Sequence, residues 1–141
     1  MITPLFRFNR STVNRVPRVL LVDDEVGFTR CTKASLEMDG QFELKTVNRA
    51  REAVDAALEF MPDVIILDIN LPDGNGGQIA SLLMDFPAFR DTPILFLTSL
   101  VTRREVSRSK GSIGGRTYLP KPISADELET CIRAALSKPR T

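Results

Sequence analysis

Two short, unbroken runs of branched apolar residues constrain the fold of this chain more than any other feature of its sequence. They occupy residues 19–22 and 64–67, and acidic residues follow each run directly: Asp23 and Asp24 after the first, Asp68 after the second. Such runs are typical of strands buried on both faces, as in a parallel sheet. Open parallel sheets bind ligands beyond the carboxyl ends of their strands, so we expect the three carboxylates to meet at one functional edge.

Three carboxylates at one sheet edge repel one another unless a cation lies between them. The pattern therefore predicts a divalent metal site next to one reactive aspartate. Each acid taken alone would more often be a turn or capping residue. Their joint occurrence with Thr98 after a further apolar run, and with Lys121 between two prolines, favours a functional site over that alternative.

The rest of the sequence alternates between strand and helix patterns. The expected strands are residues 19–22, 42–47, 64–67, 93–97 and 117–119, and the expected helices are about 28–40, 49–61, 78–84, 102–110 and 125–136. Asn48 is expected to cap the second helix and Ser124 the last one. The helix residues expected to face the core are Phe28, Cys31 and Leu36; Ala50, Ala53, Val54, Ala57 and Leu58; Ile79, Leu82 and Leu83; Leu128, Cys131, Ile132, Ala135 and Leu136.

Five strands alternating with five helices predict an α/β fold: a doubly wound, five-stranded parallel sheet flanked by five helices. No repeat or linker divides the pattern. We therefore expect one domain at residues 18–137, preceded by a flexible basic arm at residues 1–17 and followed by a short tail at residues 138–141.

The composition excludes several classes of function. With a formal net charge of +1, the chain as a whole favours neither nucleic-acid binding nor a membrane surface. No apolar run approaches the roughly 18 residues of a membrane span. Cys31 and Cys131 form no metal-binding cluster and lie on predicted apolar stripes, which indicates buried, reduced thiols and a cytoplasmic protein. The absence of histidine excludes a Ser/His or Cys/His nucleophile pair and a phosphohistidine donor.

Four motifs, each at the end of an expected strand, together resemble the receiver domain of bacterial two-component response regulators over roughly residues 19–136. They are Val22-Asp23-Asp24-Glu25, Leu67-Asp68-Ile69-Asn70-Leu71-Pro72-Asp73-Gly74, Leu97-Thr98-Ser99 and Tyr118-Leu119-Pro120-Lys121-Pro122. The resemblance implies a flavodoxin-like fold. It also implies phosphorelay signalling, in which Asp68 accepts a phosphoryl group from a phosphohistidine on a histidine kinase or histidine phosphotransfer protein.

The resemblance further implies a Mg²⁺ site. Asp24 would be a direct ligand, Asp23 would hold metal-bound water, and Asn70 would lend its backbone carbonyl beside Asp68. Such a set suits Mg²⁺, which prefers oxygen ligands and keeps several waters.

The remaining motif residues would bind the phosphoryl group and transmit its presence. Thr98 would contact the phosphoryl oxygens, and Lys121 would form an ion pair with them. The peptide bond between Lys121 and Pro122 would be cis. Tyr118 would change rotamer. The face formed by the fourth helix, fifth strand and fifth helix would then change its affinity for a downstream protein. The protein would catalyse only its own phosphorylation and dephosphorylation.

Other functions remain open at this point. A phosphatase or hydrolase with an aspartyl nucleophile would commonly carry a second acid where Asn70 stands. A flavin-binding domain would bring a phosphate to the acidic loop at residues 23–27, which would repel it. A receiver fold that serves as a constitutive docking module is a third alternative.

Two further features bear on the output. Too few residues follow Leu136 for an output domain, so we expect a receiver that docks onto another protein, relays phosphate or forms part of a longer chain. Residues 103–116 carry five basic residues and one acid. This segment could select an acidic partner or could simply be a solvated surface. No dedicated DNA-binding motif is present.

Overall fold

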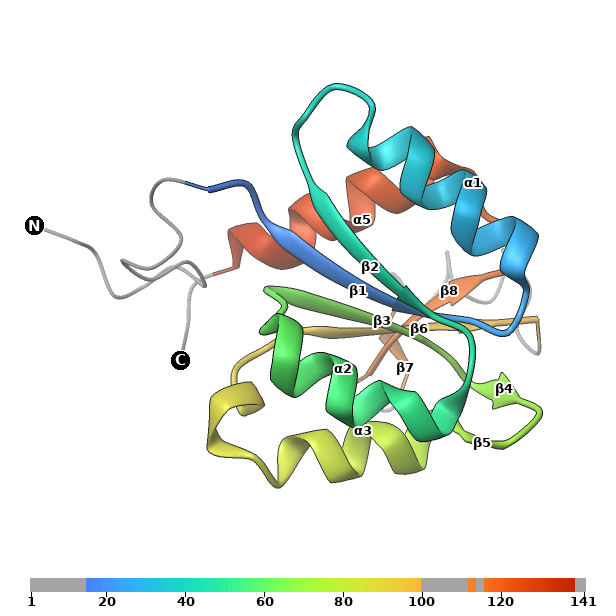
Figure 1. Cartoon of the computed structure of the whole chain (residues 1–141), viewed down its shortest axis with the longest axis vertical. Coiled ribbons are helices and arrows are strands. Elements are labelled where there is room, and N and C mark those ends of the chain that lie inside the picture. Colours follow the sequence, from blue (N-terminus) through green and yellow to red (C-terminus); the bar gives the residue numbers. More distant parts are fainter. Residues whose placement is uncertain (1–14, 100–111, 114–115, 139–141) are drawn as a thin grey trace, which may run out of the picture.

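The sheet of this protein is parallel apart from one short edge strand. The structure is a computed structural model that describes residues 15–99, 112–113 and 116–138 (Figure 1). The parallel strands are β1 (Arg18–Val22), β2 (Glu43–Val47), β3 (Val64–Asp68), β6 (Ile94–Thr98) and β8 (Arg116–Pro120). The two-residue β7 (Ser112–Ile113) pairs antiparallel with β8, which gives the order β2-β1-β3-β6-β8-β7. The predicted five-stranded parallel sheet is thus confirmed.

Helices cover both faces of the sheet, as a doubly wound fold requires. α1 (Val26–Glu37) and α5 (Ala125–Ser137) lie on one face, and α2 (Ala53–Phe60) and α3 (Gly76–Met84) lie on the other (Figure 1). The 3₁₀ turn η2 (Ala50–Glu52) precedes α2, and the 3₁₀ turn η3 (Pro87–Phe89) follows α3. Four of the five predicted helices are present, and the fifth, predicted for residues 102–110, lies outside the described residues.

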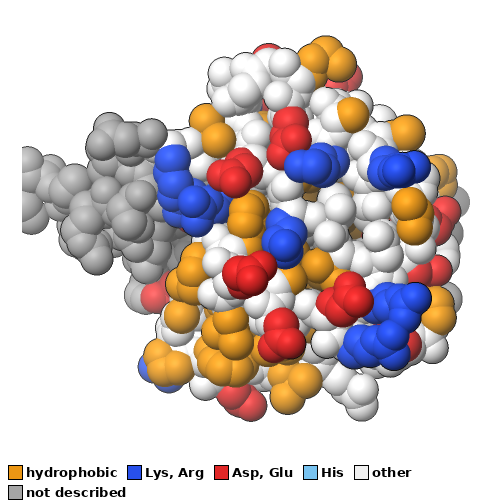
Figure 2. Space-filling model, in the orientation of Figure 1, with side chains coloured by type: hydrophobic (Ala, Val, Ile, Leu, Met, Phe, Trp, Pro, Cys, Tyr) orange, Lys and Arg blue, Asp and Glu red, His pale blue; other side chains and the backbone are white. Residues whose placement is uncertain are grey.

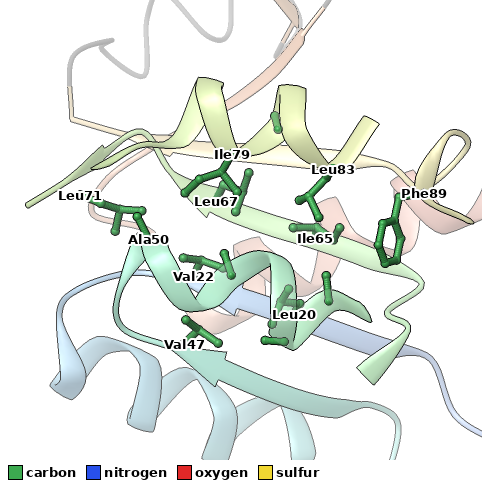
Figure 3. Packing of buried hydrophobic residues seen from close by; sticks show 14 of the residues in the cluster. Leu20, Val22, Val47, Ala50, Ile65, Leu67, Leu71, Ile79, Leu83 and Phe89 are labelled. Carbon is green, nitrogen blue, oxygen red and sulfur yellow. The ribbon is translucent and has the colours of Figure 1, made fainter. Parts of the chain in front are cut away.

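The central strands β1 and β3 are apolar over residues 19–22 and 64–67 because both faces of these strands are buried under helices. Leu20 and Ile65 point toward α2 and α3 and pack with Leu83 and Phe89 (Figure 3). The alternate side chains of β1 and β3 pack in a second cluster against α1 and α5. All five residues of β3 are buried. The apolar runs therefore reflect a position in the middle of a two-faced core.

Charged side chains of both signs are interspersed over the face shown in Figure 2. Basic residues there do not gather into one patch. Among the helices of the described segments, none is both long enough and apolar enough to span a bilayer.

Three helices face the core with different residues from those predicted. Cys31 is exposed, and the inward face of α1 instead carries Thr29, Thr32 and Leu36. The prediction that Cys31 is buried was therefore wrong, and Cys131 is only half-buried; both thiols are free. The Thr29 hydroxyl can be buried because it donates to the Val26 carbonyl and accepts from Asn48.

Leu58 of α2 and Leu82 of α3 were also predicted to face the core, but they are 40% and 55% exposed. Small residues, Ala56 and Ala80, take part in the buried faces of these helices instead. Adjacent helix positions differ by about 100° in direction, so an error of one residue in phase turns a buried position outward.

Asp73, and not Asn48, caps the turn that leads into α2. The Asp73 carboxylate accepts hydrogen bonds from the backbone N–H groups of Ala50 (2.8 Å) and Arg51 (3.2 Å), which lower the pKa of Asp73. The side chain of Asn48 instead donates to the Asp23 carbonyl, at 2.7 Å. The prediction for Asn48 was wrong, whereas the predicted capping box of Ser124 at α5 is confirmed. The Asp73 contacts fasten the loop after β3 to the start of η2.

The loop after β3 is also more regular than its turn-rich sequence indicates. β4 (Asn70–Leu71) and β5 (Gly74–Asn75), each two residues long, pair antiparallel as a hairpin. Asn75 then caps α3 through hydrogen bonds from the N–H groups of Gly77 and Gln78. The segment that follows Asp68 is therefore held at both of its ends.

Side chains near the end of α1 form hydrogen bonds to the backbone of the edge strand β2. Glu37 accepts the Leu44 N–H at 2.8 Å, and Lys33 donates to the Leu44 carbonyl at 3.0 Å and to Glu37 at 2.8 Å. Partial burial works against the charge of Glu37, but these hydrogen bonds hold its pKa below the ordinary value of 4.5. Side chains thus satisfy backbone groups that an edge strand would otherwise expose.

Glu37→Gln is expected to lower the free energy of unfolding by about 0.5 kcal/mol at neutral pH, a value reduced for the partial exposure of the pair. Because the folded pKa is lowered, the contribution is complete above 4.5 and is lost as the pH falls through the lowered pKa. Urea denaturation of wild type and variant at neutral pH and well below pH 4.5 measures this. A difference between the two that does not shrink at low pH would exclude the charged carboxylate as its cause.

Candidate functional site

The residues predicted to form the site do converge at one edge of the sheet. Since β1, β3, β6 and β8 are parallel and adjacent in register, their carboxyl ends lie side by side. Asp23 and Asp24 follow β1, Asp68 ends β3, Thr98 ends β6, and Lys121 follows β8. A hydrogen bond from the Lys121 N–H to the Thr98 carbonyl (2.9 Å) holds the last two strand ends together.

The three carboxylates form a compact cluster. Asp23, Asp24 and Asp68 each offer an oxygen, and these oxygens all lie within 4.8 Å of one another. Asp23 and Asp68 are only 0% and 4% exposed, whereas Asp24 is more open. Burial raises the pKa of Asp23 and the charge of Asp68 adds to this, while the hydrogen bond from Lys121 acts in the opposite direction.

This cluster fits a small hard cation. Every side-chain donor is a carboxylate oxygen, the ligand type that Mg²⁺ prefers. Oxygens around one Mg²⁺ lie about 3–4 Å apart, given a metal–oxygen distance of about 2.1 Å, so the cluster needs only small adjustments. A bound cation would also remove the repulsion between the carboxylates.

Lys121 binds the acidic cluster directly. Its Nζ donates to Asp23 Oδ2 at 2.8 Å, to Glu25 Oε1 at 2.9 Å and to Asp68 Oδ2 at 3.3 Å. The peptide bond from Lys121 to Pro122 is cis, as expected from the family resemblance. Partial burial disfavours the ammonium, but the bonds to Asp23 and Glu25 outweigh it and raise the pKa of Lys121, so the group stays charged.

Backbone groups fix the two buried carboxylates. Asp68 Oδ1 accepts the N–H of Asn70 at 3.0 Å, and Asp23 Oδ1 accepts the N–H of Glu25 at 2.9 Å. Beside them is an open cavity of about 500 Å³. Its lining includes the predicted site residues Asp24, Asp68, Asn70 and Lys121, together with Glu25, Phe28, Ser99, Pro122 and Ile123. The buried Thr98 lies next to Ser99 at the end of β6.

Tyr118 lies apart from this cavity. Its ring stacks on Phe96 with 5.4 Å between centroids and 28° between planes, and it packs against the core cluster on the α2 and α3 face. The Arg116 guanidinium is 5.3 Å from the centroid of the same Phe96 ring. The structure thus brings together all the predicted site residues except Tyr118, whose ring lies on the α2 and α3 side of the sheet.

Two residues of the site region were not assigned a role from the sequence. Glu25 binds Lys121 across a sequence separation of 96 residues, and Asp73 caps η2 across 23 residues. Asp73 carried a signal as part of the resembling motif after Asp68. Glu25 likewise belonged to a resembling motif, the one that contains the acidic pair, but no role was assigned to it there.

Comparison with known proteins agrees with this geometry. The family model described as the response regulator receiver domain matches residues 19–133. Response regulator Rre1 of Synechocystis sp. is 34% identical over 121 residues, which cover 85% of this chain and 52% of the relative. The phosphate regulon transcriptional regulatory protein PhoB of Rhizobium meliloti is 32% identical over 124 residues, covering 87% of this chain and 53% of the relative. A protein-glutamate methylesterase/protein-glutamine glutaminase of Carboxydothermus hydrogenoformans is 36% identical, covering 74% of this chain but 29% of the relative.

Solved structures show the same architecture. The chemotaxis response regulator CheY4 of Vibrio cholerae matches with a TM-score of 0.72 and 28% identity, covering 86% of this chain and 99% of that chain. The receiver domain of HemR from Leptospira biflexa matches with a TM-score of 0.69 and 30% identity, covering 86% and 94%. The chain spans about half or less of the length of the curated relatives named above. By its sequence and by its fold, this chain belongs to the response regulator receiver domain family of two-component signal transduction.

Proposed function

We propose that this receiver domain is cytoplasmic and is phosphorylated on Asp68, in a Mg²⁺-dependent reaction, by a phosphohistidine on a partner protein. The partner is a histidine kinase or a histidine phosphotransfer protein. The functional unit in this proposal is residues 18–137, with residues 1–17 as a basic arm and 138–141 as a tail. The described end of that arm is attached to the domain, since Arg15 Nη1 donates to Asp63 Oδ2 at 3.0 Å.

The observation that carries the proposal is the position of Lys121. A charged ammonium lies 3.3 Å from Asp68 Oδ2 and 2.8 Å from Asp23 Oδ2, beside an open cavity and a cluster of oxygen ligands. Phosphoryl transfer requires an in-line nucleophile and positive charge near the equatorial oxygens. Asp68 supplies the nucleophile and Lys121 supplies part of the charge.

The residues divide the chemistry as follows. Asp23, Asp24, Asp68 and the Asn70 carbonyl would hold Mg²⁺, which supplies further positive charge to the phosphoryl oxygens when it is bound. A carboxylate oxygen of Asp68 forms a bond to phosphorus as the phosphorus–nitrogen bond of the donor breaks. The imidazole leaves with the electron pair of that bond. A carboxylate, unlike a hydroxyl, can act as a nucleophile without a neighbouring base.

The proposed output uses Thr98 and Tyr118. A phosphoryl group adds up to about two negative charges and strong acceptor oxygens next to the end of β6, where Thr98 lies. Movement of the Thr98 hydroxyl toward that group would change the space available to Tyr118 on the next strand. The stack of Tyr118 on Phe96 would then shift between two arrangements and alter the face that a downstream protein binds.

The hydrolase alternative has less support from the site. The residue two positions after Asp68 is Asn70, whose side chain is an amide, so it provides no second acid. A domain that catalyses only its own phosphorylation and dephosphorylation suits this set of residues better. No observation on the described segments favours constitutive docking over a phosphorylation switch.

The direct test is the intact mass of the protein after incubation with a small acyl-phosphate donor, with Mg²⁺ or with a chelator. We expect one phosphoryl group per chain with Mg²⁺ and none with the chelator. Reduction of the acyl phosphate with borohydride, followed by peptide mass analysis, should then locate the modification at Asp68. A modification at any other residue, or equal labelling in the chelator, would refute the proposal.

A further inference from the structure

All three donor protons of Lys121 Nζ are directed to carboxylates. The distances are 2.8 Å to Asp23, 2.9 Å to Glu25 and 3.3 Å to Asp68. An ammonium has three donors and no acceptor. An incoming phosphoryl oxygen can therefore bind Lys121 only if one of these three contacts is released.

The contact with Glu25 is the easiest of the three to release. The side chain of Glu25 is 62% exposed, while those of Asp23 and Asp68 are 0% and 6% exposed. A carboxylate that faces water is rehydrated when it loses its partner, whereas a buried carboxylate is left uncompensated. The exchange of Glu25 for a phosphoryl oxygen thus leaves the two buried contacts of Lys121 in place.

Glu25 also does not cap the helix at whose start it stands. It is the N-cap residue of α1, a position that favours Ser, Thr, Asp or Asn, and its side chain makes no capping hydrogen bond. The side chain instead accepts a hydrogen bond from Lys121, 96 residues away in the sequence, and Glu25 lines the cavity. Its contact with the ammonium is a second observation, independent of exposure, that points to a role at the site.

We propose that Glu25 is a positioning residue that holds Lys121 in the unphosphorylated state and competes with the phosphoryl group for it. This rests on the proposed function, in which Lys121 stabilises the phosphoryl oxygens. Each phosphorylation event must separate the Glu25–Lys121 pair. The pair therefore lowers the maximal rate of phosphorylation and stabilises the unphosphorylated protein relative to the phosphorylated one.

The test compares wild type, Glu25→Gln and Asp126→Asn. Asp126 is exposed in the first turn of α5 and also carries one negative charge, so it controls for the change in net charge. Phosphorylation by a small acyl phosphate is followed by intact mass over a range of donor concentrations, with Mg²⁺ raised until the rate no longer increases. The ¹⁵N resonance of Lys121 Nζ is recorded without donor.

Glu25→Gln should raise the maximal rate about threefold to fivefold, the factor that a partly exposed ion pair contributes. The half-saturating donor concentration should change no more than in Asp126→Asn, and only Glu25→Gln should shift the Lys121 resonance. A maximal rate no higher than that of Asp126→Asn, or an unchanged resonance, would overturn the proposal. Failure of the proposed function is distinguishable, because the wild type itself would then gain no phosphate on Asp68.

Discussion

Asp68→Asn is expected to reduce the rate of phosphorylation by more than about a thousandfold while the protein remains folded. An amide has no anionic oxygen with which to attack phosphorus. Its carbonyl oxygen can still accept the Asn70 N–H, and Lys121 keeps its contacts with Asp23 and Glu25. Intact mass after incubation with Mg²⁺ and a small acyl phosphate measures the loss, and thermal unfolding measures the fold.

A suitable control is Asp85→Asn, which removes the same charge from the exposed end of α3. This variant should gain one phosphoryl group at the wild-type rate. The assignment of Asp68 as acceptor fails if the Asp68 variant still gains a phosphoryl group, or if both variants lose the reaction equally. Loss of reaction together with a large fall in melting temperature would indicate that Asp68 is chiefly structural.

The sheet and the position of the site could be predicted because their signals are local. A strand covered on both faces needs an unbroken apolar run, and residues 64–67 show this without any knowledge of the fold. Parallel pairing then sends every strand end to one edge, so Asp23, Asp68 and Lys121 had to be neighbours once the strand order was known. One sequence does not determine the strand order, which the structure gives as β2-β1-β3-β6-β8-β7.

Helix faces were harder to predict because the two faces of α1 differ little in composition. Cys31 was expected inside, and no buried position was predicted for Thr29 or Thr32. In the structure Cys31 is exposed and both threonines are buried, and the Thr29 hydroxyl finds hydrogen-bond partners in Val26 and Asn48. A hydrogen bond from a residue distant in the sequence, which allows a hydroxyl to be buried, is not visible in a local pattern.

Long-range contacts account for the remaining errors. Asn48 is a good capping residue by type, but Asp73 reaches the same backbone N–H groups from a loop 23 residues away. The partner of Glu25 is 96 residues away and is equally hidden from any local pattern. In both cases an acidic side chain was visible in the sequence, and only the fold revealed what it binds.

Among the described glycines, Gly76 is the one at which an added methyl group should most disturb the end of β3, where Asp68 lies. A Cβ atom there would lie 2.5 Å from the backbone carbonyl oxygen of Asp68 and 3.0 Å from Ile69 Cα. The Asp68 carbonyl shares its peptide group with the Ile69 N–H, which is bonded to the Leu97 carbonyl at 3.0 Å. The peptide group therefore cannot retreat without breaking the pairing of β3 with β6.

Gly76→Ala is expected to lower the free energy of unfolding by about 2 kcal/mol, within the usual range for an overpacked site. Because the clash falls on the peptide group between Asp68 and Ile69, the variant should also bind Mg²⁺ and accept phosphate less well, by about tenfold for a residual misplacement of the acceptor. Urea denaturation gives the first quantity, and titration with Mg²⁺ and the intact-mass assay give the others.

Gly27→Ala is the matched control, because a Cβ on this glycine of α1 meets no atom within 4 Å. Alanine is the better helix former, so this variant should gain up to about 0.5 kcal/mol and retain phosphorylation. If Gly76→Ala were as stable as wild type and phosphorylated as fast, the end of β3 would have to be able to move without harm. The precise placement of Asp68 by its strand would then not be what makes it reactive, and the hairpin at residues 70–75 would be a connection rather than part of the site.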